Sequence, residues 1–296
     1  MLSCSNGATQ DIGTPEQPTS PNTWFAHKFP LVAESFGEAI YIEKTDAAEK
    51  ISGLSEDFMA ATLGRRGSPE SPVVYIPIER CFYRYAPASG LFEKIEPQGL
   101  AAILSSTLRS CATECRSSID LRPLTFKYAR TANLNGVVSR AKALLAEPGF
   151  FDSPSIDFLA CRNGMLRLSA RKLLAFSPEY RRRTKLAVDY LPGEKCPRFI
   201  KTVLEPVLQP GDMDLLQRFF GMALLGQNTA QAMLILVGRG GDGKGVCIRV
   251  LRGILGASAI ASLRTDQLAS RFEIGRMHGR TLLYGPDVRS DFLNKK

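Results

Sequence analysis

Residues 233–255 read MLILVGRGGDGKGVCIRVLRGIL, and this stretch decides the fold that we expect. Met233–Val237 is a short apolar run without alternation, which predicts a strand buried on both faces of a parallel sheet. The last part of the stretch predicts a helix that ends at Gly256, because apolar residues recur on one face: Cys247, Val250, Leu251 and Ile254.

The glycine loop between this strand and helix, GRGGDGKG, matches the phosphate-binding pattern G-x-x-x-x-G-K. Glycines suit such a loop because its backbone N–H groups must approach phosphate oxygens closely, often at positive φ. The helix N-terminus adds partial positive charge. We therefore predict that one continuous segment binds the phosphates of a nucleotide: Gly238, Arg239, Gly240, Gly241, Asp242, Gly243, Lys244, Gly245 and Val246.

The loop lacks the side chain that usually binds Mg²⁺, because Gly245 stands where the pattern normally has a Ser or Thr. Downstream, residues 280–287 read RTLLYGPD, a short apolar strand that ends in an acidic residue. Folds with a phosphate loop supply a metal-coordinating carboxylate in this way. Asp287 is therefore the predicted Mg²⁺ ligand, with an ordinary Gly-Pro-Asp turn as the alternative.

Composition narrows the class of protein. A chain of 296 residues predicts two domains. The net charge of +9 favours a polyanionic partner, which for a nucleotide-binding protein means nucleic acid. Seven cysteines, an odd number, do not form a disulfide framework and indicate a reducing, cytoplasmic location. Polar residues interrupt the apolar stretch near 222–237, so no membrane span is expected.

The rest of the chain predicts an α+β domain behind a disordered leader over residues 1–22. We expect weak helix over Trp24–Leu63 and amphipathic helices over Gly99–Cys115 and Asn135–Leu145. Cys81–Tyr85 and Leu91–Ile95 predict a hairpin, whose aromatic residues favour core packing over the alternative of base stacking. Asn163-Gly164 predicts a second hairpin, with a type I′ turn.

The densest basic run is formed by Arg181, Arg182, Arg183 and Lys185. Such a run can follow a nucleic-acid backbone, and it is more often a solvated face. Both interpretations stay open on the sequence alone.

Several segments together resemble phage and plasmid primase-helicases, which are superfamily-three helicases related to the poxvirus primase-helicase. The resemblance is weak from Tyr75 and strong from about Phe150. It is carried by Cys161–Leu166 (CRNGML), Tyr190–Pro192, Cys196–Phe199, Leu215–Leu224 (LLQRFFGMAL), Gly238–Lys244, Ser270–Glu273 and Gly279–Leu283.

This resemblance implies an α/β fold: a mixed α+β accessory domain over residues 23–205, followed by a partial AAA+-type P-loop domain over residues 206–296. It also implies ATP and Mg²⁺ as cofactors. The implied partners are DNA and further copies of the chain, which assemble into a ring that is usually hexameric. By position, Gly238, Gly240, Gly241, Gly243 and Lys244 hold the triphosphate and Asp287 coordinates Mg²⁺, so Lys244 and Asp287 are the catalytic candidates.

The chain departs from the family pattern at two positions. Gly245 replaces the Ser or Thr, and Val288 replaces a second acidic residue, for which Asp291 is a substitute candidate. Few residues follow the glycine loop, so we expect a piece of a helicase without the sensor Asn and arginine finger, inactive or weakly active. The alternative is a non-catalytic nucleic-acid-binding or oligomerisation module with a relic phosphate loop. An unrelated kinase or GTPase fits poorly.

Overall fold

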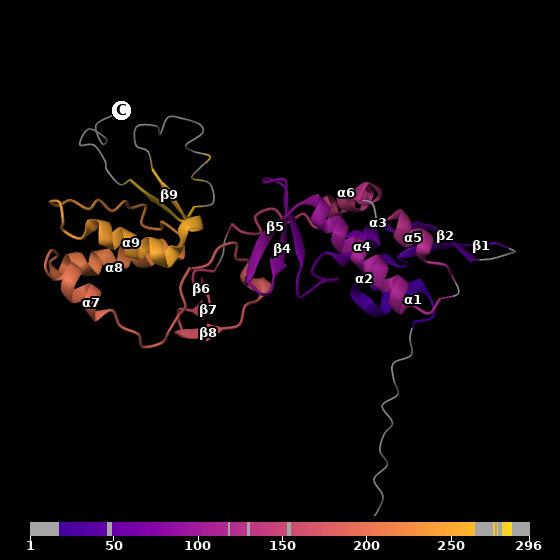
Figure 1. The fold of residues 1–296 in the computed structure, drawn as a ribbon, viewed down its shortest axis with the longest axis horizontal. Helices are drawn as coiled ribbons and strands as arrows, with labels where there is room; N and C mark the ends of the chain where they lie inside the picture. The colour runs from indigo at the N-terminus through magenta and orange to yellow at the C-terminus, as the bar shows by residue number, and fades with distance from the viewer. Residues whose placement is uncertain are drawn as a thin grey trace, which may run out of the picture. The chain divides into compact units, whose positions relative to one another are not determined.

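A computed structural model describes residues 18–45, 49–117, 119–128, 131–152, 155–263, 275, 277 and 280–285. The chain divides into two compact units (Figure 1). Unit 1 contains Met1–Arg84 and Lys94–Pro148, and unit 2 contains Tyr85–Glu93 and Gly149–Lys296. The fold is mixed α/β with small antiparallel sheets. The predicted domain boundary after residue 205 lies inside unit 2 and stays a prediction.

Unit 1 buries one apolar core between helices and two small antiparallel sheets. Its helices are α1 (Pro21–Lys28), α2 (Pro30–Phe36), α3 (Glu56–Thr62), α4 (Pro97–Glu114), α5 (Arg122–Lys127) and α6 (Asn135–Leu144). The strands are β1 (Ile40–Lys44), β2 (Glu49–Leu54), β3 (Val73–Ile76), β4 (Cys81–Ala86) and β5 (Leu91–Ile95), the last two reaching into unit 2 at the hairpin tip.

The predicted amphipathic helices of unit 1 are confirmed as α4 and α6. Leu100, Leu104, Leu108 and Cys111 recur at helical spacing along α4, and all four are buried. The prediction of helix throughout Trp24–Leu63 is wrong for part of that range. Ile40–Lys44 (β1) and Glu49–Leu54 (β2) pair as antiparallel strands instead. They contain the β-branched residues Ile40, Ile42 and Ile51, which favour strand over helix.

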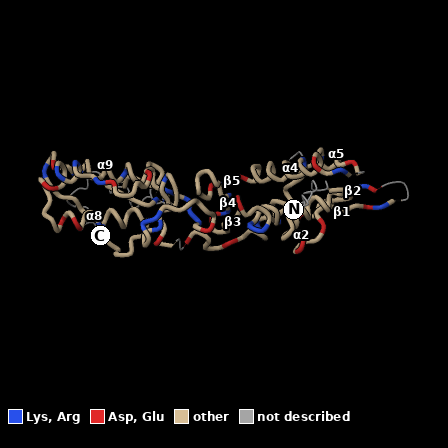
Figure 2. Tube along the Cα trace, turned by 90° about the horizontal axis from the view of Figure 1, so that it is seen from below, with Lys and Arg blue, Asp and Glu red and all other residues tan. Residues whose placement is uncertain are grey.

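The β1–β2 hairpin carries charges of both signs, as Figure 2 shows. Lys44 and Glu49 approach to 3.1 Å, but both side chains are largely exposed. Exposed ion pairs contribute little to stability. The packing of Ile40 and Leu54 against the core therefore holds this hairpin in place.

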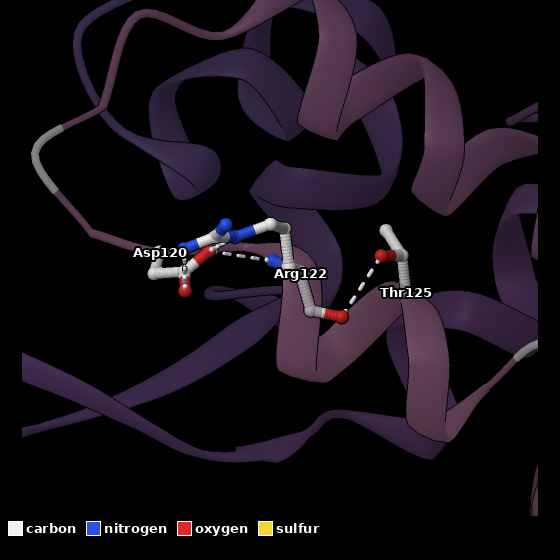
Figure 3. Close-up of polar contacts among 3 residues, drawn as sticks. All are labelled: Asp120, Arg122 and Thr125. Atoms are coloured by element: carbon white, nitrogen blue, oxygen red, sulfur yellow. Dashed lines mark hydrogen bonds and ion pairs between the residues drawn. The ribbon is translucent and has the colours of Figure 1, made fainter.

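Helix α5 begins with a local carboxylate contact (Figure 3). The Asp120 carboxylate accepts hydrogen bonds from the backbone N–H of Arg122 at 3.0 Å and from Arg122 Nε at 2.9 Å. Thr125 Oγ1 donates to the Arg122 carbonyl at 3.0 Å. The Arg122 side chain lowers the pKa of Asp120, so this start of α5 is strongest when the carboxyl is ionised.

Unit 2 combines a three-stranded antiparallel sheet, two long helices and a two-stranded parallel sheet. Its elements are β6 (Phe158–Cys161), β7 (Gly164–Arg167), β8 (Lys172–Leu174), α7 (Pro197–Phe199), the π-helix η3 (Ile200–Leu204), α8 (Pro210–Leu225), α9 (Lys244–Leu255), β9 (Ile260–Ser262) and β10 (Leu282–Tyr284). The hairpin tip of β4 and β5 belongs to this unit.

The predicted hairpin at Asn163-Gly164 exists, but its turn lies one residue earlier. Cys161 pairs with Gly164, so Arg162 and Asn163 form the two-residue loop. A type I′ turn needs positive φ at both loop residues, and neither has it. Gly164 has φ +152 within strand β7, where an added Cβ would lie 2.7 Å from the Leu174 carbonyl oxygen of the neighbouring strand. This glycine therefore allows strands β7 and β8 to approach each other closely.

The predicted strand Met233–Val237 is wrong: the segment has no strand partner in the described structure. Leu234 and Leu236 pack beside Leu204, Leu216 and Cys247, whereas the alternate side chains point outward. Met233 is 64%, Ile235 56% and Val237 90% exposed. A two-sided buried strand requires a neighbour along its edge, and in the described part of the chain β10 pairs only with β9.

The helix predicted after the glycine loop is confirmed as α9, which lies beside α8 (Figure 1). Leu251 and Leu255 of α9 share a cluster with Ala223 of α8, and Gly226 and Gly256 end the two helices at positive φ. None of the described helices is long and apolar enough to cross a membrane.

Candidate nucleotide-binding loop and basic segment

The glycine loop lies directly before helix α9. Gly243 is the N-cap residue of α9 with φ +75, and Gly241 has φ +93, both in the left-handed region. A Cβ at residue 243 would also lie 3.0 Å from Val203 Cγ1 in the π-helix η3. The backbone angle therefore favours glycine at this position, and the contact with η3 leaves little room for a Cβ.

Two side chains fold back onto the loop. Lys244 Nζ donates to the Arg239 carbonyl at 2.7 Å, and the Asp242 carboxylate accepts the Arg239 N–H at 2.5 Å. An added Cβ at Gly238 would lie 2.8 Å from Asp242 Oδ2 and 3.2 Å from Lys244 Nζ. Both charged side chains therefore lie at the start of the loop.

The loop has the features that phosphate binding requires. The backbone N–H groups of Val246 and Cys247 bond to the Gly243 carbonyl, whereas those of Lys244 and Gly245 have no backbone acceptor in the described structure. Gly240, Gly241 and Gly245 have open space where a Cβ would stand. The residues therefore fit a triphosphate, provided that Lys244 Nζ exchanges the Arg239 carbonyl for phosphate oxygen.

The predicted metal ligand cannot be placed. Asp287 lies outside the described residues, as do Val288 and Asp291. Strand β10 ends at Tyr284 and runs parallel to β9, so a short strand does precede Asp287 as expected. Gly245 offers no side-chain ligand, and the assignment of Mg²⁺ stays a prediction.

The basic segment lies over aromatic rings of unit 2. The Arg181 guanidinium stands 4.8 Å from the Phe150 ring centre, and that of Arg183 stands 4.4 Å from the Phe151 ring centre. Lys185 Nζ is 5.2 Å from the Phe176 ring and donates to the Ser89 carbonyl at 2.8 Å. Cation–π contacts hold these side chains in defined positions.

The Arg182 side chain is partly buried. Its Nη2 donates to the carbonyls of Ser155 and Phe158, at 2.6 and 2.5 Å, and its own carbonyl accepts from the Phe92 N–H at 2.7 Å. Burial lowers the pKa of its guanidinium. Arg182 thus joins the β4–β5 hairpin tip to the start of β6, while Arg181 and Arg183 are exposed beside it. Nucleic-acid contact by the four residues stays a prediction.

Two segments that carried the family resemblance are in direct contact. Asn163 in the β6–β7 loop exchanges two hydrogen bonds with the Tyr190 backbone, at 3.1 and 3.0 Å. Arg162 forms a bidentate pair with Asp189, at 2.9 and 2.7 Å, which lowers the pKa of Asp189. Ala187 then donates its N–H to the Ile254 carbonyl of α9 at 2.8 Å. The β6–β7 hairpin and the glycine-loop helix are therefore linked through residues 186–190.

Comparison with known families gives a match over part of the chain. Residues 76–209 match the family model described as D5 N terminal like. The chain carries a D5 N-terminal-like domain. This domain is the N-terminal domain of poxvirus D5-like primase-helicases, which confirms that part of the resemblance. No curated protein matches the chain.

The D5 N-terminal-like domain includes η3, whose Val203 touches Gly243 of the glycine loop. It also includes the hairpin contacts at Asn163 and Arg162 and the whole basic segment. The match ends before the glycine loop. Sequence reasoning missed the aromatic partners of the basic segment, although the pair Phe150-Phe151 was visible as a signal.

Proposed function

We propose that this chain is the ATP-binding portion of a phage- or plasmid-type replicative DNA helicase, whose complete form unwinds DNA at the expense of NTP. The observation that carries the proposal is a glycine loop at the N-terminus of α9, which follows the D5 N-terminal-like domain along the chain, with α8 between them. That domain occurs in primase-helicases, and the loop contains the lysine that phosphate binding needs.

In this proposal Lys244 and the N–H groups at the start of α9 hold the β- and γ-phosphates. Asp287 would hold a Mg²⁺ ion, which would supply positive charge against the phosphates of ATP. Because Gly245 lacks the hydroxyl that normally binds Mg²⁺, we expect slow hydrolysis or none. Further copies of the chain, in a ring of six, and DNA are the proposed partners.

A second function is favoured by Gly245, which stands in place of a Ser or Thr, and by the hydrogen bonds that charged side chains form inside the loop. Asp242 and Lys244 satisfy groups of the loop itself, as a relic loop without ligand would. In that case the chain is a non-catalytic nucleic-acid-binding or oligomerisation module.

The deciding experiment measures ATP binding by calorimetry, with and without Mg²⁺, on the chain and on Lys244→Ala. We expect binding to the unchanged chain and at least about tenfold weaker binding to the variant, since a charged hydrogen bond is lost. A matched control is Lys201→Ala, which removes an equal charge from the neighbouring η3. Equal affinity of all three proteins, or no binding at all, would refute the helicase-motor proposal and favour the module.

A further inference from the structure

A groove on unit 1 combines positive charge, hydroxyl groups and an apolar floor. It encloses about 460 Å³ between α1, β4 and α4. Its polar rim consists of Lys28, Arg84, Ser106, Thr107 and Ser110, and none of the residues that line it is acidic. The groove is separate in the sequence from the glycine loop and from the basic segment.

Both cations of the rim have a neighbour within unit 1. Arg84, which lines the groove, donates from Nε to Ser71 Oγ at 2.9 Å, and this hydrogen bond does not use the terminal nitrogens of the guanidinium. Lys28 Nζ stands 6.0 Å from the centre of the Trp24 ring. A guanidinium fork and an ammonium group on the same groove favour an anion with several oxygens, such as phosphate.

The hydroxyl groups come from one face of α4. Ser106 and Ser110 are four residues apart, so they lie one turn apart on the helix. Thr107 Oγ1 donates to the Ile103 carbonyl at 3.1 Å and keeps its acceptor capacity. Hydroxyl groups can donate to phosphate oxygens or accept from a sugar hydroxyl or a base amine.

The floor of the groove is apolar and larger than a lone anion requires. Trp24 and Phe29 are buried beneath it, with Ile103 at its side. Trp24 Nε1 donates to Glu114 Oε2 at 3.1 Å, so this carboxylate is occupied at the indole edge. Small-molecule sites typically enclose about 300–1,000 Å³. The volume of this groove falls in that range, so it has room for a base and sugar as well as a phosphate.

We propose that this groove binds a nucleotide, with the phosphate between Lys28 and Arg84 and the base and sugar against the floor. The nucleotide is either free or one unit of a single strand, since both present the same chemistry. The proposal is independent of ATP binding at the glycine loop, because it uses residues of unit 1 alone.

The experiment uses Trp24 as its reporter, because it is the only tryptophan of the chain. Intrinsic fluorescence is titrated with dTMP, with a dT15 oligonucleotide and with inorganic phosphate. The protein is the full chain carrying Lys244→Ala, so that the glycine loop does not contribute. Movement of Lys28 from the indole toward phosphate is expected to change the emission in the dTMP or dT15 titration.

The variant Lys28→Gln/Arg84→Gln removes both cations, and we expect at least about tenfold weaker binding. The matched control Arg109→Gln/Lys142→Gln removes equal charge from α4 and α6 outside the groove and should keep the affinity. Circular dichroism confirms that both proteins are folded. Binding of dTMP identifies a free nucleotide as ligand, and binding of dT15 alone identifies a single strand.

Three results would overturn the proposal. One is an unchanged emission with all probes, and another is equal loss of affinity in the cation variant and the matched control. The third is binding of inorganic phosphate as tight as that of dTMP, which would mean that the apolar floor holds no base. Each result is distinct from a failure of ATP binding at Lys244.

Discussion

At the scale of single residues, Gly243 shows why the loop needs glycine. We expect Gly243→Ala to lower the free energy of unfolding by about 1–3 kcal/mol, because alanine is strained at φ +75. Gly245→Ala is the control: it lies in the first turn of α9 with open space at its Cβ. Alanine there should be neutral or stabilising by about 0.5–1 kcal/mol. Urea unfolding measures both, and equal effects would contradict this account of the loop.

Asp157 provides a pH dependence with a defined sign. Its carboxylate accepts from the Ser169 backbone N–H and hydroxyl, both at 2.8 Å, and from Arg167 Nε at 3.1 Å. The Ser169 backbone N–H first, then its hydroxyl and Arg167, lower the pKa of Asp157 below its ordinary 3.8. The stabilisation is thus fully present above the ordinary pKa and is lost as pH falls through the lower, folded-state pKa.

We therefore expect Asp157→Asn to destabilise the protein at pH 7 and to have a smaller effect at pH 3. Other carboxylates with lowered pKa, such as Asp57 and Asp189, remain in both proteins and cancel in the difference. Thermal melting at the two pH values measures it. A difference between variant and unchanged chain that grows toward pH 3 would contradict the assignment.

At the scale of elements, the segment Met233–Val237 has one packed and one exposed side. We expect Ile235→Ser to change the free energy of unfolding by less than about 0.5 kcal/mol, because that side chain is already 56% exposed. Leu236→Ser should cost about 1–2 kcal/mol, since it removes apolar contact with the cluster around Leu216 and Cys247.

Chemical denaturation of the two serine variants tests this arrangement. If Ile235→Ser were as destabilising as Leu236→Ser, the segment would be buried on both sides in solution, as a parallel strand is. Solubility gives a second readout, because exposed apolar side chains promote self-association. Ile235→Ser should therefore raise the solubility of the protein.

At the scale of the whole molecule, the net charge of +9 leads to a test of DNA binding. Each phosphate contact on a single strand adds about 0.7 to the slope of log K against log salt. Because Arg181 and Arg183 are exposed, we expect Arg181→Gln/Arg183→Gln to reduce this slope by about 1.4 in fluorescence anisotropy with dT15.

The same double variant on α4 and α6, Arg109→Gln/Lys142→Gln, is the control for overall charge. An equal change of slope in both proteins would mean that the basic segment makes no specific contact. Arg182 is left out of this test, since its donation to the Ser155 and Phe158 carbonyls makes its loss a folding defect.

The sequence by itself determined the features that depend on local periodicity and local backbone preference. Leu100, Leu104 and Leu108 marked α4, Cys247 and Leu251 marked α9, and the glycines marked the loop directly before α9. These features follow from spacing along one helix or from a single φ angle, which neighbours along the chain decide.

Only the tertiary structure decided which groups meet across the chain. It left Met233–Val237 without a strand partner, moved the β6–β7 turn to Arg162-Asn163, and laid Arg181 over Phe150. It also brought Lys28 and Arg84 to one groove. Such pairings depend on strand edges and packing between distant segments, and no periodicity in a single stretch of residues encodes them.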